Sequence, residues 1–300
     1  MSTKLIAPIA CVAFAAAVAA GTSSVTASQR GHTEQSALVT AVTDDAKAVT
    51  NLTATDFLVS EDKMNREVIR VGAAPPPSHV VLLIDDSQAA ERSIQFLRTA
   101  VPAFINGISA LTPAPQVAVM TFGERPTMRA DFQPKTDAAL VAAGKLFATP
   151  GTGSYLLQAL MDASKNLTKH AAKNPVIVVF AAEAGPEFSS ERREVVASAM
   201  QKAGASLWAI VLQGPARMDL TPEGLERQAV LNDVVKQTGG FTRTIQSDQG
   251  VDSAFGVIGD LVKSRYVVTY SRPEDLIPPK SVEVTAKRSD VRVLASRWTK

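Results

Sequence analysis

The chain has 300 residues, of which 46% are hydrophobic and 20% are charged, and its formal net charge is +2. This composition is typical of a globular protein with a sizeable core and excludes a disordered chain. Acidic and basic residues are mixed without a basic stripe, so we expect neither nucleic acid nor a membrane surface as a partner. The length allows one large domain, or one domain with a small companion.

The N-terminus has the pattern of a secretory signal peptide. Lys4 precedes an apolar run over residues 5–20, and small and polar residues follow. Cleavage after Ala20 fits the pattern, and cleavage after Ala27 is an alternative. An uncleaved anchor is another, because the run is close to the length that spans a bilayer. We expect an exported protein, secreted or held in the periplasm or cell envelope, without a membrane span after cleavage.

The chain contains one cysteine, Cys11, inside this apolar run. The run continues well beyond Cys11, which is not typical of a lipoprotein signal. Cleavage would leave a chain without cysteine, and this excludes disulfides and thiolate metal sites.

A tether and a small β unit are predicted next. Residues 21–36 are rich in Ser, Thr, Gln and Gly, which indicates a flexible tether. The β unit is predicted over residues 37–74, and its strands are expected at residues 37–43, 56–62 and 67–71. The second and third strands look like a hairpin that turns through residues 62–65.

From residue 78 onward, buried strands alternate with amphipathic helices. The strands are continuous apolar runs, as in a parallel sheet covered on both faces, at residues 79–84, 116–122, 176–180 and 206–212. Helices are predicted at residues 89–108, 137–147, 154–171, 190–204, 224–238 and 251–264. This alternation predicts an α/β fold with a doubly wound, mainly parallel sheet over residues 78–264. Residues 265–300 return to short alternating strands, which we expect to pack with the N-terminal β unit.

The predicted binding edge is the acidic turn after the first apolar strand. Ligands of open parallel sheets bind at the C-terminal ends of the strands. The turn reads Asp85-Asp86-Ser87, and loops at residues 122–123, 151–154 and 181–185 reach the same edge. Carboxylate and hydroxyl oxygens from several loops are the ligands that Mg²⁺ prefers.

These features resemble the von Willebrand factor A family, and in particular its secreted bacterial relatives, from about Ser36 to the C-terminus. The resemblance is carried by five segments: Asn51–Phe57, Asp85–Ser87, Gly151–Ser154, Thr238–Gly240 and Tyr266–Tyr270. It implies the family's doubly wound fold and a protein-binding or adhesion function.

The resemblance also implies a metal-ion-dependent adhesion site, built in that family from two aspartates, two serines and a threonine. Asp85 and Ser87 match the first aspartate and the first serine, and Ser154 offers a hydroxyl at the threonine position. If Mg²⁺ or Mn²⁺ binds, these three residues are the predicted metal ligands.

Two positions depart from that pattern. Ala89 stands where the second serine is expected, and the second aspartate is either lost at Ala182 or displaced to Glu183. Because Mg²⁺ demands near-ideal geometry, these losses weaken its binding. The resemblance therefore implies a degenerate site, with Glu183 as a further binding residue. The alternative is that Asp85 and Ser87 only tie the loops together by hydrogen bonds.

Other polar motifs are assigned to ordinary structural roles. The histidines are too far apart for a metal site, and residues 151–154 lack the lysine of a phosphate-binding loop. Glu187, Glu191 and Glu194 are predicted to form a solvated helix start.

The leading hypothesis is a protein-binding module, with an unidentified partner, centred on Asp85, Ser87 and Ser154. One alternative is a hydrolytic or transfer enzyme that uses Asp85, Asp86 or Glu183. Because no nucleophile, base and orienting group form a triad in the sequence, we predict that the protein is not an enzyme. A passive structural envelope protein is the other alternative.

Overall fold

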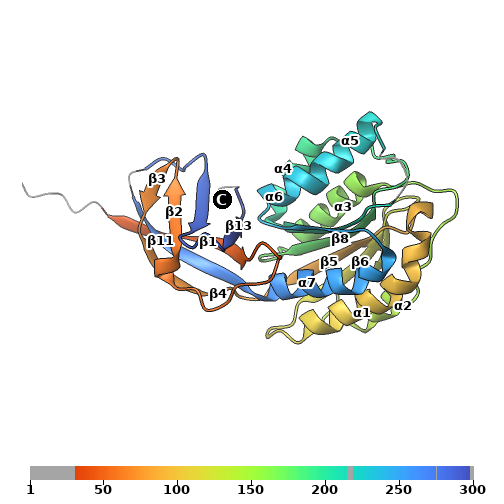
Figure 1. Cartoon of the computed structure of the whole chain (residues 1–300), viewed down its shortest axis with the longest axis horizontal. Coiled ribbons are helices and arrows are strands. Elements are labelled where there is room, and N and C mark those ends of the chain that lie inside the picture. Colours follow the sequence, from red (N-terminus) through yellow and green to blue (C-terminus); the bar gives the residue numbers. More distant parts are fainter. Residues whose placement is uncertain (1–30, 215–218, 275, 298–300) are drawn as a thin grey trace, which may run out of the picture.

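The computed structural model describes residues 31–214, 219–274 and 276–297. Two parts lie side by side along the longest axis of the molecule: a large sheet with helices on both faces, and a smaller part made of strands (Figure 1). The predicted signal peptide and both cleavage positions lie outside the described residues. Among the helices of the described ranges, none is long and apolar enough to cross a membrane.

The larger part is built on a six-stranded sheet with the order β10-β9-β8-β5-β6-β7. The edge strand β7 is antiparallel to β6, and all the other pairs are parallel. The strands are β5 (His79–Ile84), β6 (Gln116–Thr121), β7 (Thr127–Ala130), β8 (Val176–Ala182), β9 (Ser206–Leu212) and β10 (Thr242–Ile245). The predicted doubly wound, mainly parallel sheet is confirmed. Strands β7 and β10 were not predicted, because both are short and largely polar.

Helices cover both faces of this sheet (Figure 1). One face carries α1 (Ile94–Ser109), α2 (Asp137–Gly144) and α7 (Val251–Lys263); the other carries α3 (Leu156–Lys169), α4 (Arg193–Ala203), α5 (Pro222–Ala229) and α6 (Val235–Gln237). A 3₁₀ segment, Gln88–Ser93, precedes α1, and a π-helical segment, Val230–Val234, joins α5 to α6.

Central strand β5 contributes to both cores. Val80, Leu82 and Ile84 pack in the cluster with α1, α2 and α7, whereas Val81 and Leu83 pack in the cluster with α3 and α4. Every residue of β5 is buried, which explains its continuous apolar sequence.

The smaller part consists of two antiparallel sheets, in the orders β13-β1-β11-β4 and β12-β2-β3. Its strands are β1 (His32–Val42), β2 (Phe57–Glu61), β3 (Met64–Arg66), β4 (Val68–Ala73), β11 (Arg265–Pro273), β12 (Val282–Ala286) and β13 (Arg292–Ala295). Side chains of both sheets, including Phe57, Val59, Tyr266 and Val268, form one core. The predicted packing of C-terminal strands with the N-terminal unit is confirmed, since β11 and β13 pair with β1, and β12 pairs with β2.

Two local predictions in this part were wrong. Strand β1 begins at His32, inside the predicted tether, because His32 to Thr40 pair with β11 from Pro273 back to Arg265. The predicted hairpin also has a different second strand. Asp62 and Lys63 both have positive φ, 47° and 70°, so a tight turn returns the chain directly into β3. Strand β4 instead joins the other sheet beside β11.

Candidate functional site

The Asp85 carboxylate lies at the carboxyl end of β5 and is 1% exposed. The backbone N–H of Ser87 donates to its Oδ1 (2.9 Å), and the N–H of Ala182 donates to its Oδ2 (3.0 Å). Burial raises the pKa of Asp85, although hydrogen bonds from Ser87 and Ala182 and the charge of Arg227 oppose the rise. Asp85 therefore ties the acidic turn after β5 (Asp85–Ser87), called the first loop below, to the end of β8.

Asp86 ties the first loop to β6 and β7. The N–H of Gly123 donates to Asp86 Oδ1 (2.6 Å), and Arg129 Nη2 forms an ion pair with Oδ2 (3.1 Å). The Arg129 guanidinium also lies over the Phe147 ring, 5.1 Å from its centroid. A Cβ on Gly123 would come within 2.5 Å of the backbone nitrogen of Ser87, so only glycine fits there.

Ser154 binds Glu187, which the sequence pattern predicts to lie in a solvated helix start. The Ser154 hydroxyl donates to Glu187 Oε2 (2.8 Å), and the N–H of Ser189 donates to Oε1 (3.2 Å). Glu187 is 3% exposed, and burial raises its pKa. That prediction was wrong because the loop folds back onto Ser154: the Ser154 N–H donates to Pro186 O and the Phe188 N–H donates to Ser154 O, both at 2.8 Å.

Arg227 of α5 is a buried cation at the same edge. Its Nη2 donates to the carbonyl oxygens of Glu183 (2.8 Å) and Gly185 (3.2 Å). The sequence does not single out Arg227, because this residue lies in an amphipathic helix far along the chain from the acidic turn. Its burial, against the default for a helical arginine, appears only when α5 packs against the loop after β8.

The loop after β8 also closes against the first loop. Gly185 has a φ of +89°, and a Cβ added there would lie 3.2 Å from the Cβ of Ala89. Ala182 contributes its backbone N–H to Asp85, and Glu183 uses its N–H to bind Leu212 O (2.9 Å). At the two positions where the resemblance implies further oxygen ligands, Ala89 packs against Gly185 and Ala182 donates its backbone N–H. Glu183, next to Ala182, also bonds through its backbone N–H.

These contacts do not fit a divalent cation. Both Asp85 oxygens accept backbone N–H groups, and the Ser154 hydroxyl donates to Glu187. A buried arginine already lies beside the loop, and Mg²⁺ dehydrates reluctantly unless several oxygens surround it in near-octahedral geometry. Within the described ranges, no group of three or more His, Cys, Asp or Glu side chains could hold a metal. Metal binding by Asp85, Ser87 and Ser154 is a prediction that these contacts do not favour.

Exposed apolar side chains lie near the buried polar groups of this edge. Phe188 is 52% exposed, Phe147 51% and Leu220 72%. The Phe188 ring lies 5.8 Å from that of Tyr155 and covers Gly153, where a Cβ would approach the ring to 2.5 Å. Phe188 is thus held in place by its neighbours while half of its surface faces solvent.

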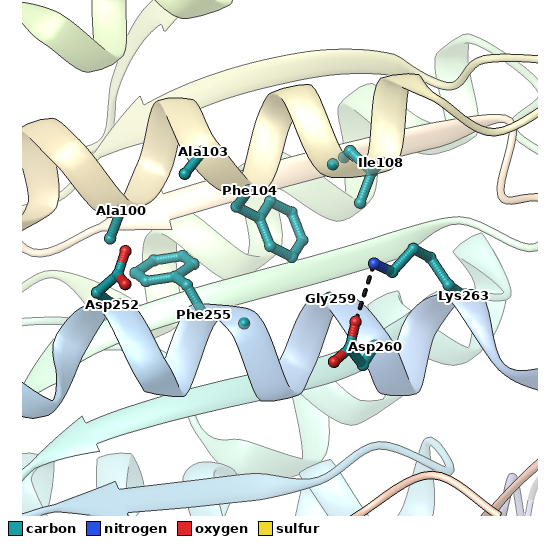
Figure 2. A pocket seen from close by; sticks show the side chains of 11 residues that line it. Ala100, Ala103, Phe104, Ile108, Asp252, Phe255, Gly259, Asp260 and Lys263 are labelled. Carbon is teal, nitrogen blue, oxygen red and sulfur yellow. Dashed lines mark ion pairs between the residues drawn. The ribbon is translucent and has the colours of Figure 1, made fainter.

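A groove of about 220 Å³ runs between α1 and α7, in the helical layer instead of at the strand ends (Figure 2). Phe104 and Phe255 lie in it with ring centroids 5.8 Å apart, beside an ion pair between Asp260 and Lys263 (2.9 Å). None of the residues that line it belongs to the predicted site.

The fold and the edge together define an open-sheet α/β domain with buried polar groups at the carboxyl ends of its strands. The family model of the von Willebrand factor type A domain matches residues 79–240, more than half of the chain. The chain therefore belongs to the von Willebrand factor type A domain family, whose domains are protein-interaction modules. A comparison with curated protein sequences gave no significant match.

Several solved structures are similar to this chain. Proximal thread matrix protein 1 from the mussel byssus is 13% identical with a TM-score of 0.50, and the match covers 68% of this chain and 49% of that protein. A von Willebrand factor type A protein from Catenulispora acidiphila is 12% identical (TM-score 0.46, 90% of this chain, 74% of that one). BatB from Bacteroides thetaiotaomicron is also 12% identical (TM-score 0.46, 62% and 99%). The chain spans about half the length of the byssus protein.

Proposed function

We propose that this protein is an exported protein-binding module whose partner docks at the carboxyl edge of the six-stranded sheet without a divalent cation. The observation that carries the proposal is the exposed Phe188 ring next to the buried Ser154–Glu187 pair. Phe188 follows Glu187 in the chain, and its backbone N–H donates to Ser154 O. In this proposal Asp85, Ser87 and Ser154 form the rigid base of the face, and Glu183 lies beside it.

A rigidly held aromatic ring is an effective binding group. Phe188 loses little conformational entropy on binding, because Tyr155 and Gly153 already restrict its ring. Aromatic residues at the centre of an interface supply a large part of its binding free energy. The hydrogen bonds beneath Phe188 fix the backbone that carries it.

Export rests on the N-terminal sequence. Lys4 and the apolar run to residue 20 have the pattern of a signal peptide. N-terminal sequencing of the protein recovered from the envelope or the medium tests this. A first residue of Gly21 or Ser28 is expected, and an intact Met1 would contradict cleavage at either position.

Capture of partners from a native envelope extract tests the binding face. Wild type, Phe188→Ala and the control Met64→Ala are immobilised; Met64 is 63% exposed on β3, in the smaller part. We expect wild type and Met64→Ala to retain the same partner in Mg²⁺ and in EDTA, and Phe188→Ala to retain about tenfold less. Equal capture by Phe188→Ala would contradict the face, and loss of wild-type capture in EDTA would contradict cation-free binding.

A further inference from the structure

We propose that the Arg227 guanidinium supplies, as a built-in part of the chain, the positive charge that a divalent cation would supply at this edge. The inference rests on the proposed function, because it concerns the same face and explains how the face keeps its shape without metal. It makes Arg227 a positioning residue for the binding edge.

The Arg227 side chain reaches from α5 to the loop that follows β8. Its Nη2 bonds the carbonyls of Glu183 and Gly185, and so brackets the segment immediately after Ala182. Ala182 in turn donates its N–H to the Asp85 carboxylate. The backbone of the loop after β8 therefore connects the two groups: it accepts hydrogen bonds from the Arg227 guanidinium and donates one to the Asp85 carboxylate.

Burial makes the charge of Arg227 effective. The residue is 2% exposed, and its Nη1 is buried without a hydrogen-bond partner among the described residues. A buried cation is retained only when nearby negative charge compensates for its loss of hydration. Two buried carboxyl groups border the loop that Arg227 bonds and can supply that charge: Asp85, which accepts the Ala182 N–H, and Glu187, two residues after Gly185.

The neighbouring acid has a cation of its own. Asp86 is 3% exposed and pairs with Arg129 at 3.1 Å, on the opposite side of the first loop. Asp85 and Asp86 are adjacent in sequence and equally buried, but only Asp85 is assigned to Arg227. This difference provides a matched control for the electrostatic role.

A double-mutant cycle tests the assignment in the full exported chain, with the melting temperature Tm as the readout. Arg227→Met removes the charge at similar length, and we expect it to lower the Tm by about 10 °C. Asp85→Asn should lower the wild-type Tm, and in the Arg227→Met background its effect should be at most half as large. Asp86→Asn should cause the same drop in both backgrounds. An undiminished Asp85→Asn effect in the Arg227→Met background would overturn the proposal and leave Arg227 as a simple loop support.

A charge-conserving cycle covers the case in which Arg227→Met does not fold. Arg227→Lys retains the positive charge, so Asp85→Asn should cause its full Tm drop in that background. A drop reduced by half or more would overturn the proposal, whatever the Arg227→Met variant does.

Mg²⁺ itself provides the last test. Because the fixed guanidinium supplies the charge, millimolar Mg²⁺ should change the wild-type Tm by less than about 1 °C relative to EDTA. A rise of several degrees that disappears in Asp85→Ala would show a working metal site and overturn the inference. These measurements need no partner, so they remain decisive even if Phe188→Ala shows that nothing docks at the edge.

Discussion

The Ser154 hydroxyl and the Glu187 carboxylate form a buried hydrogen bond of 2.8 Å between two loops at the carboxyl edge of the sheet. A second contact supports it, since the backbone N–H of Glu187 donates to Asp219 Oδ2 (3.0 Å), and Asp219 precedes α5. The pair therefore connects the loop before α3 to the segment that leads into the helix carrying Arg227.

Ser154→Ala should lower the free energy of unfolding by about 1–3 kcal/mol, because it leaves a buried Glu187 oxygen without its hydroxyl donor. Ser190→Ala, at an exposed position of the same loop, should change it by less than about 0.5 kcal/mol. Urea denaturation of both variants measures the difference. Equal effects would show that the Ser154–Glu187 bond contributes nothing measurable.

The stability of the larger part should fall as the pH decreases through the range of His79. Burial, with a smaller contribution from the charge of His170, holds the pKa of His79 below its ordinary value of 6.5. The unfolded chain then binds more protons than the folded chain just below pH 6.5, so this contribution is present above that pH and is lost on acidification. His79→Phe, which keeps a ring against Phe132 (4.7 Å from His79), should flatten the Tm profile between about pH 5 and 7.

His32→Ala is the control for that profile, because His32 is exposed at the start of β1. Its profile should follow that of wild type. A His79→Phe profile as steep as wild type would assign the pH dependence to other groups.

Glu61 should be the most sensitive acid of the smaller part. It is 2% exposed and accepts from Tyr270 Oη (3.0 Å) and Arg66 Nε (2.9 Å). Glu61→Ala leaves the partly buried Arg66 and the buried Tyr270 hydroxyl without this partner. It should therefore lower the free energy of unfolding by about 3–5 kcal/mol. Arg70→Ala breaks an exposed pair with Glu34 and should cost less than about 1 kcal/mol. Chemical denaturation compares the two, and similar costs would refute the buried-network interpretation.

Two glycine substitutions should change the free energy of unfolding in opposite directions. Gly123→Ala places a Cβ within 2.6 Å of the backbone around Asp86 and Ser87, so the first loop must shift. This should lower the free energy of unfolding by about 1–3 kcal/mol. Gly107→Ala, inside α1 with open space around the added Cβ, should stabilise by about 0.5–1 kcal/mol. Thermal unfolding distinguishes them, and a neutral Gly123→Ala would show that the loop adapts freely.

Local pattern was sufficient where burial follows from consecutive residues. The apolar run of β5 and its alternation with amphipathic helices predicted the parallel sheet, and the turn after Ile84 predicted which edge carries polar groups. The short polar strands β7 and β10 escaped prediction, because pairing at a sheet edge needs few apolar residues.

The acidic turn Asp85-Asp86-Ser87 was therefore determined by the sequence, but its electrostatic partners were not. Glu187 resembles the solvated acids that follow it, and becomes buried only because its loop pairs with Ser154, 33 residues earlier. Arg227 reaches the same edge from α5, and His32 enters a strand only through β11, which lies more than 230 residues away. Composition and periodicity report on neighbours along the chain, whereas the free energy of a buried charge depends on groups that only the tertiary structure brings together.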